Sequence, residues 1–169
     1  MPTSIQVPVT LQQLDHVRSL MRSFVAWHRE RHQEDRHLID AYFDAGAFEE
    51  ELASLPGKYA HPHGHLLLAT VDGSPAGCVA LRGIDSGSCE MKRMFVYPHF
   101  HGQGVGRALG EAIVMEAKAL GYRTMRLDTS VRQDEARGLY HRLGFTPIEP
   151  YYDVRQEMKG WLVFMELAL

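Results

Sequence analysis

The sequence has few cysteines and no long apolar run, and these absences count against a disulfide-stabilised protein and a membrane-spanning protein. Two cysteines, Cys78 and Cys89, are too few to stabilise a domain of 169 residues by disulfide bonds, so we expect both to be reduced core residues. No apolar run approaches the length of a membrane span, and the first residues lack the basic and apolar regions of a signal peptide. The sequence therefore predicts a cytoplasmic protein with no membrane partner.

An excess of basic residues is also missing. The 18 Lys and Arg residues stand against 21 Asp and Glu residues, so there is no global basic field that would indicate a nucleic-acid partner. An anionic ligand would have to be held by local donors. Apolar residues make up 45% of the chain and charged residues 23%, which is typical of a globular core. Without a repeat, low-complexity tract or linker, we expect a single domain over residues 1–169.

Apolar periodicity predicts strands and helices that alternate in the second half of the chain. The predicted strands, which are apolar segments between turn signals, cover residues 5–9, 66–71, 76–81, 89–96, 124–129, 145–148 and 161–167. The predicted helices, which carry apolar residues three and four apart, cover residues 11–25 (capped by Thr10), 47–55, 105–120 and 136–143. Strand-helix-strand order in the second half predicts a parallel pair within a mixed sheet.

The most informative segment joins the strand at 89–96 to the helix at 105–120. Glycines at positions 102, 104 and 106 let a ligand approach the backbone closely. The first turn of the helix has N–H groups without partners, and the helix dipole adds partial positive charge there. We therefore predict a diphosphate cradle, to which Arg107, and His101 when protonated, would add charge-assisted contacts.

Other phosphate motifs fit this segment poorly. A P-loop needs Lys followed by Ser or Thr after the glycines, whereas Arg107 and Ala108 stand there. A dinucleotide-binding fingerprint needs a third glycine at a fixed spacing, and Arg107 or Leu109 occupies that position. These mismatches count against a nucleotide binder, and a tight turn without a ligand is the remaining alternative.

Two segments resemble motifs of the GNAT acetyltransferases. Residues 101–106, followed by Leu109, are similar to the family's acetyl-CoA signature, Gln/Arg-x-x-Gly-x-Gly/Ala, and residues 90–98 resemble its fourth strand. Residues 136–145, with Leu139-Tyr140 and Gly144-Phe145, resemble the motif that follows. The resemblance covers nearly the whole chain. It implies an α/β (α+β) GNAT acyl-CoA acyltransferase fold, with a mixed sheet of about seven strands splayed between the fourth and fifth and about four helices.

The chain departs from the family pattern at two positions. His101 replaces the usual Gln or Arg, and Gln133 replaces the usual Asn three residues before Ala136. In this family, backbone N–H groups make most of the diphosphate contacts, so the change to His101 should weaken cofactor binding little. The second puts in doubt a side-chain hydrogen bond to the cofactor, although Gln keeps the amide group.

The resemblance implies an enzyme that transfers the acetyl group of acetyl-CoA to a primary amine of a small molecule or peptide by direct attack, without a metal. The strand backbone at Met94, Phe95 and Val96 would pair with the pantetheine arm, as an added strand does. The remaining residues assigned to coenzyme A by resemblance are His101, Gly102, Gln103, Gly104, Val105, Gly106, Arg107, Gln133 and Tyr140.

Two residues are assigned to catalysis by the same resemblance. Tyr140 would act as the general acid that protonates the departing thiolate; its alternative is a core aromatic on the apolar stripe of its helix. Glu90 would act as the general base, since burial between strands would raise its pKa; its alternative is a strand residue paired with Lys92 or Arg93.

Several functional alternatives stay open. A non-catalytic acyl-CoA-binding or regulatory module would share the fold, and the resemblance leaves a homodimer open. His28 and His32 lie four apart, and His61, His63 and His65 alternate, but such spacings are expected by chance among ten histidines, so we predict no metal site. The loop histidines and the segment 151–153 are candidates for the acceptor side; the sequence does not identify the acceptor amine.

Overall fold

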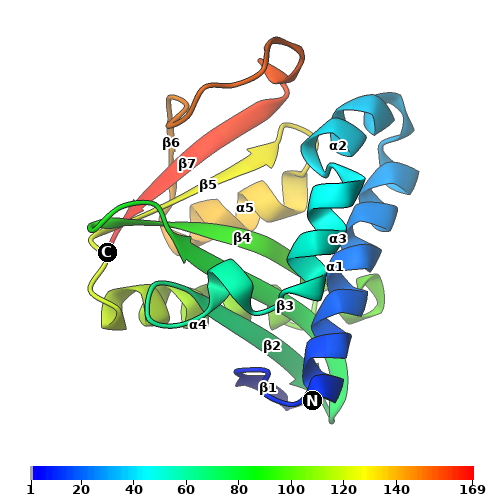
Figure 1. The fold of residues 1–169 in the computed structure, drawn as a ribbon, viewed down its shortest axis with the longest axis vertical. Coiled ribbons are helices and arrows are strands. Elements are labelled where there is room, and N and C mark those ends of the chain that lie inside the picture. The colour runs from blue at the N-terminus through cyan, green and yellow to red at the C-terminus, as the bar shows by residue number, and fades with distance from the viewer. Residues whose placement is uncertain (1) are drawn as a thin grey trace.

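The computed structural model describes residues 2–169, which form one mixed sheet of seven strands flanked by helices (Figure 1). The strands run β1 Thr3–Gln6, β2 His65–Val71, β3 Ser74–Gly83, β4 Ser88–Val96, β5 Thr124–Ser130, β6 Thr146–Ile148 and β7 Leu162–Ala168. They lie in the order β1-β2-β3-β4-β5-β7-β6, and of these described strands only β4 and β5 pair in parallel. The predicted mixed sheet and its parallel pair are confirmed.

Among residues 2–169, five α-helices surround the sheet, one more than predicted: α1 Leu11–Arg31, α2 Arg36–Tyr42, α3 Ala45–Ala53, α4 Val105–Ala119 and α5 Asp134–Leu143. The missed helix is α2. Its seven residues are too few to show an apolar period, and only Leu38 and Ile39 are buried. These two pack against Met158 and Trp161, so tertiary contacts stabilise α2.

Helices cover both faces of the sheet. On β3, Val79 and Leu81 face the core beneath α4, whereas Cys78 and Ala80 face the core beneath α1. Successive side chains of a strand point to opposite faces, so a strand buried on both sides is apolar at every position. Both cysteines are buried and free, as expected. Within residues 2–169, no helix has the length and apolar character needed to cross a membrane.

Helix α1 is long and begins at a defined cap. The Thr10 hydroxyl accepts a hydrogen bond from the Gln13 N–H at 3.1 Å, and the Gln13 side chain accepts one from the Thr10 N–H at 3.1 Å. This reciprocal capping box satisfies two of the N–H groups that a helix start leaves open. From this start the helix runs 21 residues, so its C-terminal half reaches the centre of the sheet and carries Phe24, Trp27 and His28 there.

The centre of the sheet opens between β4 and β5. The two strands pair only over Ser88–Glu90 and Thr124–Arg126, and then separate towards α1 and α2 (Figure 1). Strand β4 also carries one extra residue: Phe95 pairs with Cys78 and Lys92 with Ala80, so three steps on β4 match two on β3. This β-bulge places Arg93 at a φ of +60°, a left-handed backbone conformation that is energetically costly for any residue other than glycine.

An ion pair with α3 holds the bulge in place. The Arg93 guanidinium donates two hydrogen bonds to Glu51, at 2.8 and 2.9 Å, and lies over the rings of Phe43 and Phe48. The Arg93 and Glu51 side chains are 10% and 9% exposed, so the pair is largely desolvated. The pair therefore fixes the shape of β4 where it leaves β5.

Candidate active site

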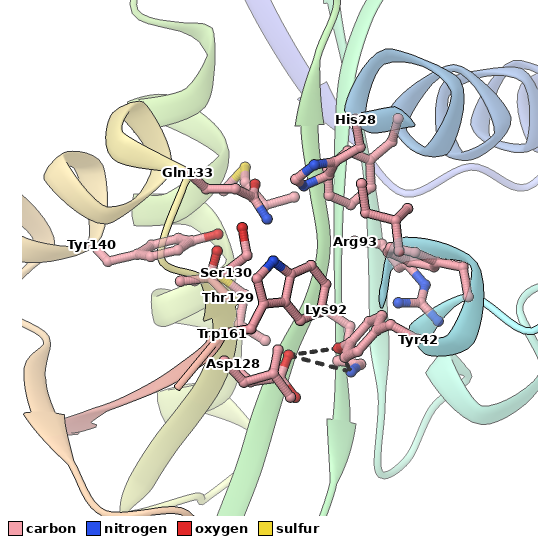
Figure 2. Close-up of a pocket in the computed structure, with 16 residues that line it drawn as sticks. His28, Tyr42, Lys92, Arg93, Asp128, Thr129, Ser130, Gln133, Tyr140 and Trp161 are labelled. Atoms are coloured by element: carbon pink, nitrogen blue, oxygen red, sulfur yellow. Dashed lines mark hydrogen bonds and ion pairs between the residues drawn. The ribbon is translucent and has the colours of Figure 1, made fainter. Parts of the chain in front are cut away.

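Two adjoining cavities occupy the opening between β4 and β5. The first, which we call the elbow cavity, lies between the end of β4, the glycine-rich turn and α5, and its lining includes Val96, Gly104 and Leu139. The second, which we call the cleft cavity, lies deeper between β4, β5 and α1, and its lining includes His28, Ser130 and Tyr140 (Figure 2). Phe24, Met94 and Gln133 line both cavities, so the two meet at these residues.

The glycine-rich turn has a left-handed backbone conformation at two of its three glycines. Gly102 and Gly104 have φ values of +78° and +81°, and a Cβ added at either would meet nothing within 4 Å. Glycine is needed there for its conformation rather than for space. Gly104 is the N-cap of α4 and provides no side chain to pair with the first N–H groups of the helix. Those N–H groups and the positive end of the helix dipole are therefore free to bind an anion.

Gly106 differs from the other two glycines. It lies inside α4, and a Cβ there would meet Leu139 at 3.5 Å and Val96 at 3.7 Å, which are ordinary packing distances. Neither backbone strain nor crowding within the chain therefore requires glycine at this position. Gly106 lines the elbow cavity, and the absence of its side chain leaves room there for a ligand.

The polar side chains of the turn are engaged locally. The His101 ring nitrogen Nε2 lies 2.9 Å from the Val96 carbonyl oxygen, and Arg107 donates to Glu111 at 2.8 Å. Gln103 donates to the His99 carbonyl at 3.3 Å. Of the residues predicted to contact coenzyme A, those that line the elbow cavity are Met94, Phe95, Val96, His101, Gly102, Gly104, Val105, Gly106, Arg107 and Gln133. Gln103 and Tyr140 are not among them, and Tyr140 lines the cleft cavity instead.

Tyr140 projects from α5 into the cleft cavity, where its hydroxyl points into the space between β4 and β5 (Figure 2). The residue is 7% exposed and its ring packs against Phe145 at 5.9 Å between centroids. Burial raises the pKa of the Tyr140 phenol above its ordinary value, so the group keeps its proton at neutral pH. The sequence placed Tyr140 either in the core or in the site, and the structure gives it both surroundings.

His28 lines the cleft cavity from α1, opposite Tyr140 (Figure 2). It is 2% exposed, and its Nδ1 atom has no hydrogen-bond partner among residues 2–169. Burial, with a contribution from His32, lowers the pKa of His28 to about 4 against an opposing polar contact with the Gln133 side chain, so the ring is neutral at physiological pH. In the sequence, His28 stands out as half of a pair with His32 at a spacing of four residues. Its place on the buried stripe of α1, four residues after Phe24, was the signal that it faces the interior.

A hydrogen-bonded cluster forms the floor of the cleft cavity. Tyr42 donates to Asp128 at 2.6 Å and accepts from Lys92 at 2.9 Å, while Tyr152 donates to the other Asp128 oxygen at 2.6 Å (Figure 2 shows the contacts among the first three). Burial lowers the pKa of Lys92, although Asp128 and Glu90 oppose this shift. The charges of this floor are therefore paired within the protein.

Glu90 lies beside this cluster and lines neither cavity. It is 1% exposed; one carboxylate oxygen accepts from Arg82 at 2.8 Å, and the other accepts a short hydrogen bond from the Tyr151 hydroxyl. Lys92 Nζ lies 3.8 Å from the first oxygen. To act as a base, Glu90 would have to give up one of these partners, so the geometry favours a positioning role; its role as general base stays a prediction.

The structure offers little to a metal ion in the part of the chain that it describes. No group of three or more His, Cys, Asp or Glu side chains within residues 2–169 is placed to hold one. The rings of His28 and His32 lie 5.4 Å apart, which leaves a pair without further ligands.

Comparisons with known proteins identify the family. The model of the acetyltransferase (GNAT) family matches residues 18–145, so the chain belongs to this family. An uncharacterised N-acetyltransferase of Schizosaccharomyces pombe is 41% identical over 106 residues, which are 62% of this chain and 65% of that protein, just under two thirds of its length. An IAA acetyltransferase of Azospirillum brasilense is 36% identical over 121 residues, covering 69% of this chain and 76% of that protein.

Solved structures agree with the fold. The PaiA N-acetyltransferase of Thermoplasma acidophilum, determined in complex with coenzyme A, superposes with a TM-score of 0.74 over 100% of both chains at 17% identity. The family and the seven-stranded splayed sheet predicted from the sequence are thereby confirmed. The roles assigned to individual residues stay predictions.

Proposed function

We propose that the protein is an acetyl-CoA-dependent N-acetyltransferase that acetylates a primary amine of a small molecule or peptide. The observation that carries this proposal is the junction of the two cavities at Met94 and Gln133. A cofactor held by its diphosphate at the glycine-rich turn can extend along the end of β4 and place its thioester at this junction. The acceptor amine then occupies the cleft cavity.

The cofactor site combines two kinds of backbone contact. Free N–H groups at the start of α4, from Val105 to Arg107, would bind the diphosphate. The end of β4, from Met94 to Val96, borders the opening where no strand follows it, so its peptide groups can pair with the amides of an extended pantetheine arm. The PaiA enzyme of Thermoplasma acidophilum was determined with coenzyme A bound, which supports the same ligand for this chain.

A side chain of the cleft cavity can supply the proton that direct attack of an amine on a thioester requires. Acetyl-CoA provides an activated acyl group as a thioester. The amine nitrogen forms a bond to the carbonyl carbon and releases one of its two protons to solvent, the carbon–sulfur bond breaks, and the sulfur takes up a proton. Tyr140, whose buried phenol remains protonated, would donate that proton from α5. A backbone N–H near Val96 would polarise the thioester carbonyl.

A thiol-release assay against a panel of amines tests this proposal. We expect release of coenzyme A from acetyl-CoA with at least one primary amine, and calorimetric binding of acetyl-CoA but not of ATP or NAD. If acetyl-CoA binds and no amine of any class releases thiol, the protein is instead an acyl-CoA-binding module. If ATP or NAD binds in its place, the cofactor assignment itself is wrong.

A further inference from the structure

Two buried polar atoms in the cleft cavity have no hydrogen-bond partner in the part of the chain that the structure describes. They are His28 Nδ1 and Ser130 Oγ, on residues that are 2% and 3% exposed. Buried polar groups are nearly always hydrogen-bonded, because an unpaired one loses its water without compensation. Among residues 2–169, buried side-chain nitrogens of Arg29 and His65 also lack a hydrogen bond, although Arg29 Nε lies 2.8 Å from Asp40 in an ion pair. Only His28 and Ser130 of this set line the cleft cavity.

The two atoms come from opposite walls of the same space. His28 projects from α1, whereas Ser130 lies at the end of β5, where the strand has left β4 (Figure 2). Tyr140 and Met94, at the junction with the elbow cavity, line the same space. A group that pairs with both atoms would therefore lie next to the place where the thioester is expected.

We propose that His28 and Ser130 together bind the nitrogen of the acceptor and make the enzyme selective for uncharged primary amines. This inference rests on the proposed function. With its proton on Nε2, the neutral imidazole of His28 presents Nδ1 as an acceptor, and the Ser130 hydroxyl presents oxygen lone pairs. An unprotonated primary amine has two N–H donors and one lone pair. It can donate one N–H to each residue and keep the lone pair for the carbonyl carbon.

Other acceptors satisfy this pair less well. A secondary amine has one N–H, so it leaves either His28 or Ser130 unpaired and brings a second carbon into the cavity. The cavity volume is about 50 Å³, room for a few water molecules, which suits an amino group on an unbranched carbon. An alkylammonium ion has a third N–H and no lone pair, so it can bind but not react.

The test compares variants on matched amines. We would measure kcat/KM for the best primary amine of the panel and for its N-methyl derivative, using wild type, His28→Leu, His28→Asn and Ser130→Ala. Leu and Ala remove the acceptor atoms, whereas Asn returns an oxygen near the position of Nδ1. We expect His28→Leu and Ser130→Ala each to lower kcat/KM for the primary amine by about tenfold, the loss of one hydrogen bond. The KM for acetyl-CoA should be unchanged, and the preference for the primary amine should fall.

Partial recovery in His28→Asn would separate hydrogen bonding from packing. Unchanged kcat/KM in both His28→Leu and Ser130→Ala, or an unchanged preference for the primary over the N-methyl amine, would overturn the inference. A binding measurement keeps it testable even if the wild type acetylates nothing. The imidazole ¹⁵N signal of His28 in the coenzyme A complex should shift with trifluoroethylamine, which is uncharged at neutral pH, and less with its N-methyl derivative. Equal shifts or none would refute the inference independently of catalysis.

Discussion

At the scale of the residue, the two roles considered for Tyr140, proton donor and packing aromatic, belong to different parts of its side chain. Its ring contacts Phe145 within the core, and its hydroxyl faces the cleft cavity. The substitution Tyr140→Phe keeps the ring and removes only the proton. We expect kcat to fall by about a hundredfold or more, the usual contribution of a general acid, while the affinity for acetyl-CoA and the thermal stability change little.

The pH profile gives this prediction a second readout. Because the pKa of Tyr140 is raised by burial, the wild-type phenol stays protonated at alkaline pH beyond its ordinary pKa of about 10. Tyr140 should therefore add no alkaline decline to kcat below that pH. Steady-state rates of both enzymes across the alkaline range check this, and an unchanged kcat in Tyr140→Phe would remove Tyr140 from the chemistry.

Gly106 offers a way to separate ligand binding from folding. A Cβ at this position meets only ordinary contacts inside the protein, and alanine is favoured over glycine in a helix by up to about 1 kcal/mol. We therefore expect Gly106→Ala to keep or raise the unfolding temperature and to weaken the binding of acetyl-CoA, because its methyl group occupies the elbow cavity. Calorimetric binding and thermal unfolding of the same sample measure both effects.

Gly104→Ala is the matched control. Its φ of +81° strains any residue with a side chain, so this variant should lose stability by about 1–2 kcal/mol. If Gly106→Ala bound acetyl-CoA as tightly as the wild type, the turn would not hold the cofactor in the way proposed here.

At the scale of the element, local patterns predicted those parts that depend on local sequence. The strand predicted at 124–129 is β5, Thr124–Ser130, and the helix predicted at 105–120 is α4, Val105–Ala119. The first strand was predicted at 5–9 but lies at Thr3–Gln6. Pro8 cannot donate to a sheet, and Val7 and Val9 are 43% and 76% exposed, so their apolar alternation did not mark a buried face.

The splay and the bulge of β4 depend on contacts far along the chain. Nothing in the segment 88–96 indicates that Arg93 has a positive φ, because the partner that holds it, Glu51, lies on α3. The glycine-rich turn was predictable since its chemistry is that of its own backbone. The cleft cavity was not, because α1, α2, β4 and β5 contribute its walls, and only the fold brings His28 and Ser130 together.

The Arg93–Glu51 pair should make stability depend on acid pH. Burial alone would raise the pKa of Glu51, but Arg93 and Lys58 outweigh it and lower this pKa from 4.5 to about 2. A carboxyl group with a depressed pKa in the folded state stabilises the fold above its unfolded pKa and loses that contribution as pH falls through its folded pKa. The contribution of Glu51 to the unfolding free energy is therefore lost as the pH falls from about 4.5 to about 2.

Glu51→Gln should accordingly lower the unfolding free energy by about 3 kcal/mol at neutral pH, a figure that follows from the size of the shift. The difference from wild type should shrink as the pH falls through the window, which denaturant unfolding at a series of pH values would show. Glu49→Gln is the control, since its exposed pair with Arg22 is screened by water and should matter little. A difference that stays constant with pH would mean that the Glu51 carboxylate does not carry the effect.

At the scale of the whole molecule, the two halves of the sheet are tied together across the cleft. The α1 side and the α5 side are joined by Arg31 and Glu135 at 2.5 Å. Deeper in, Asp35 accepts from Arg132 at 2.5 Å and from the indole of Trp161 at 3.2 Å. Since Trp161 lines the cleft cavity, Asp35 positions one of its walls from the segment that joins α1 to α2.

Removal of the Asp35 contacts should weaken the binding of the acceptor amine more than the binding of acetyl-CoA. The substitution Asp35→Ala leaves the Trp161 indole without its acceptor and removes one of the two carboxylates, Asp35 and Glu34, that pair with Arg132. We therefore expect a loss of stability of about 1–3 kcal/mol. The cleft cavity lies beside Trp161, whereas the elbow cavity does not include that residue. The KM for the amine should therefore rise several-fold while the KM for acetyl-CoA stays close to the wild-type value.

Steady-state kinetics with each substrate varied in turn measures this split, with Arg22→Ala as a control that breaks an exposed ion pair between α1 and α3. That variant should leave both KM values unchanged, because its contact lies outside both cavities. A parallel rise of both KM values in Asp35→Ala would show that the contact supports the whole fold rather than one wall. The separation of the two effects is what a sheet opened between β4 and β5 predicts, since the cofactor depends on the end of β4 and the start of α4, and the acceptor depends on what closes the opening.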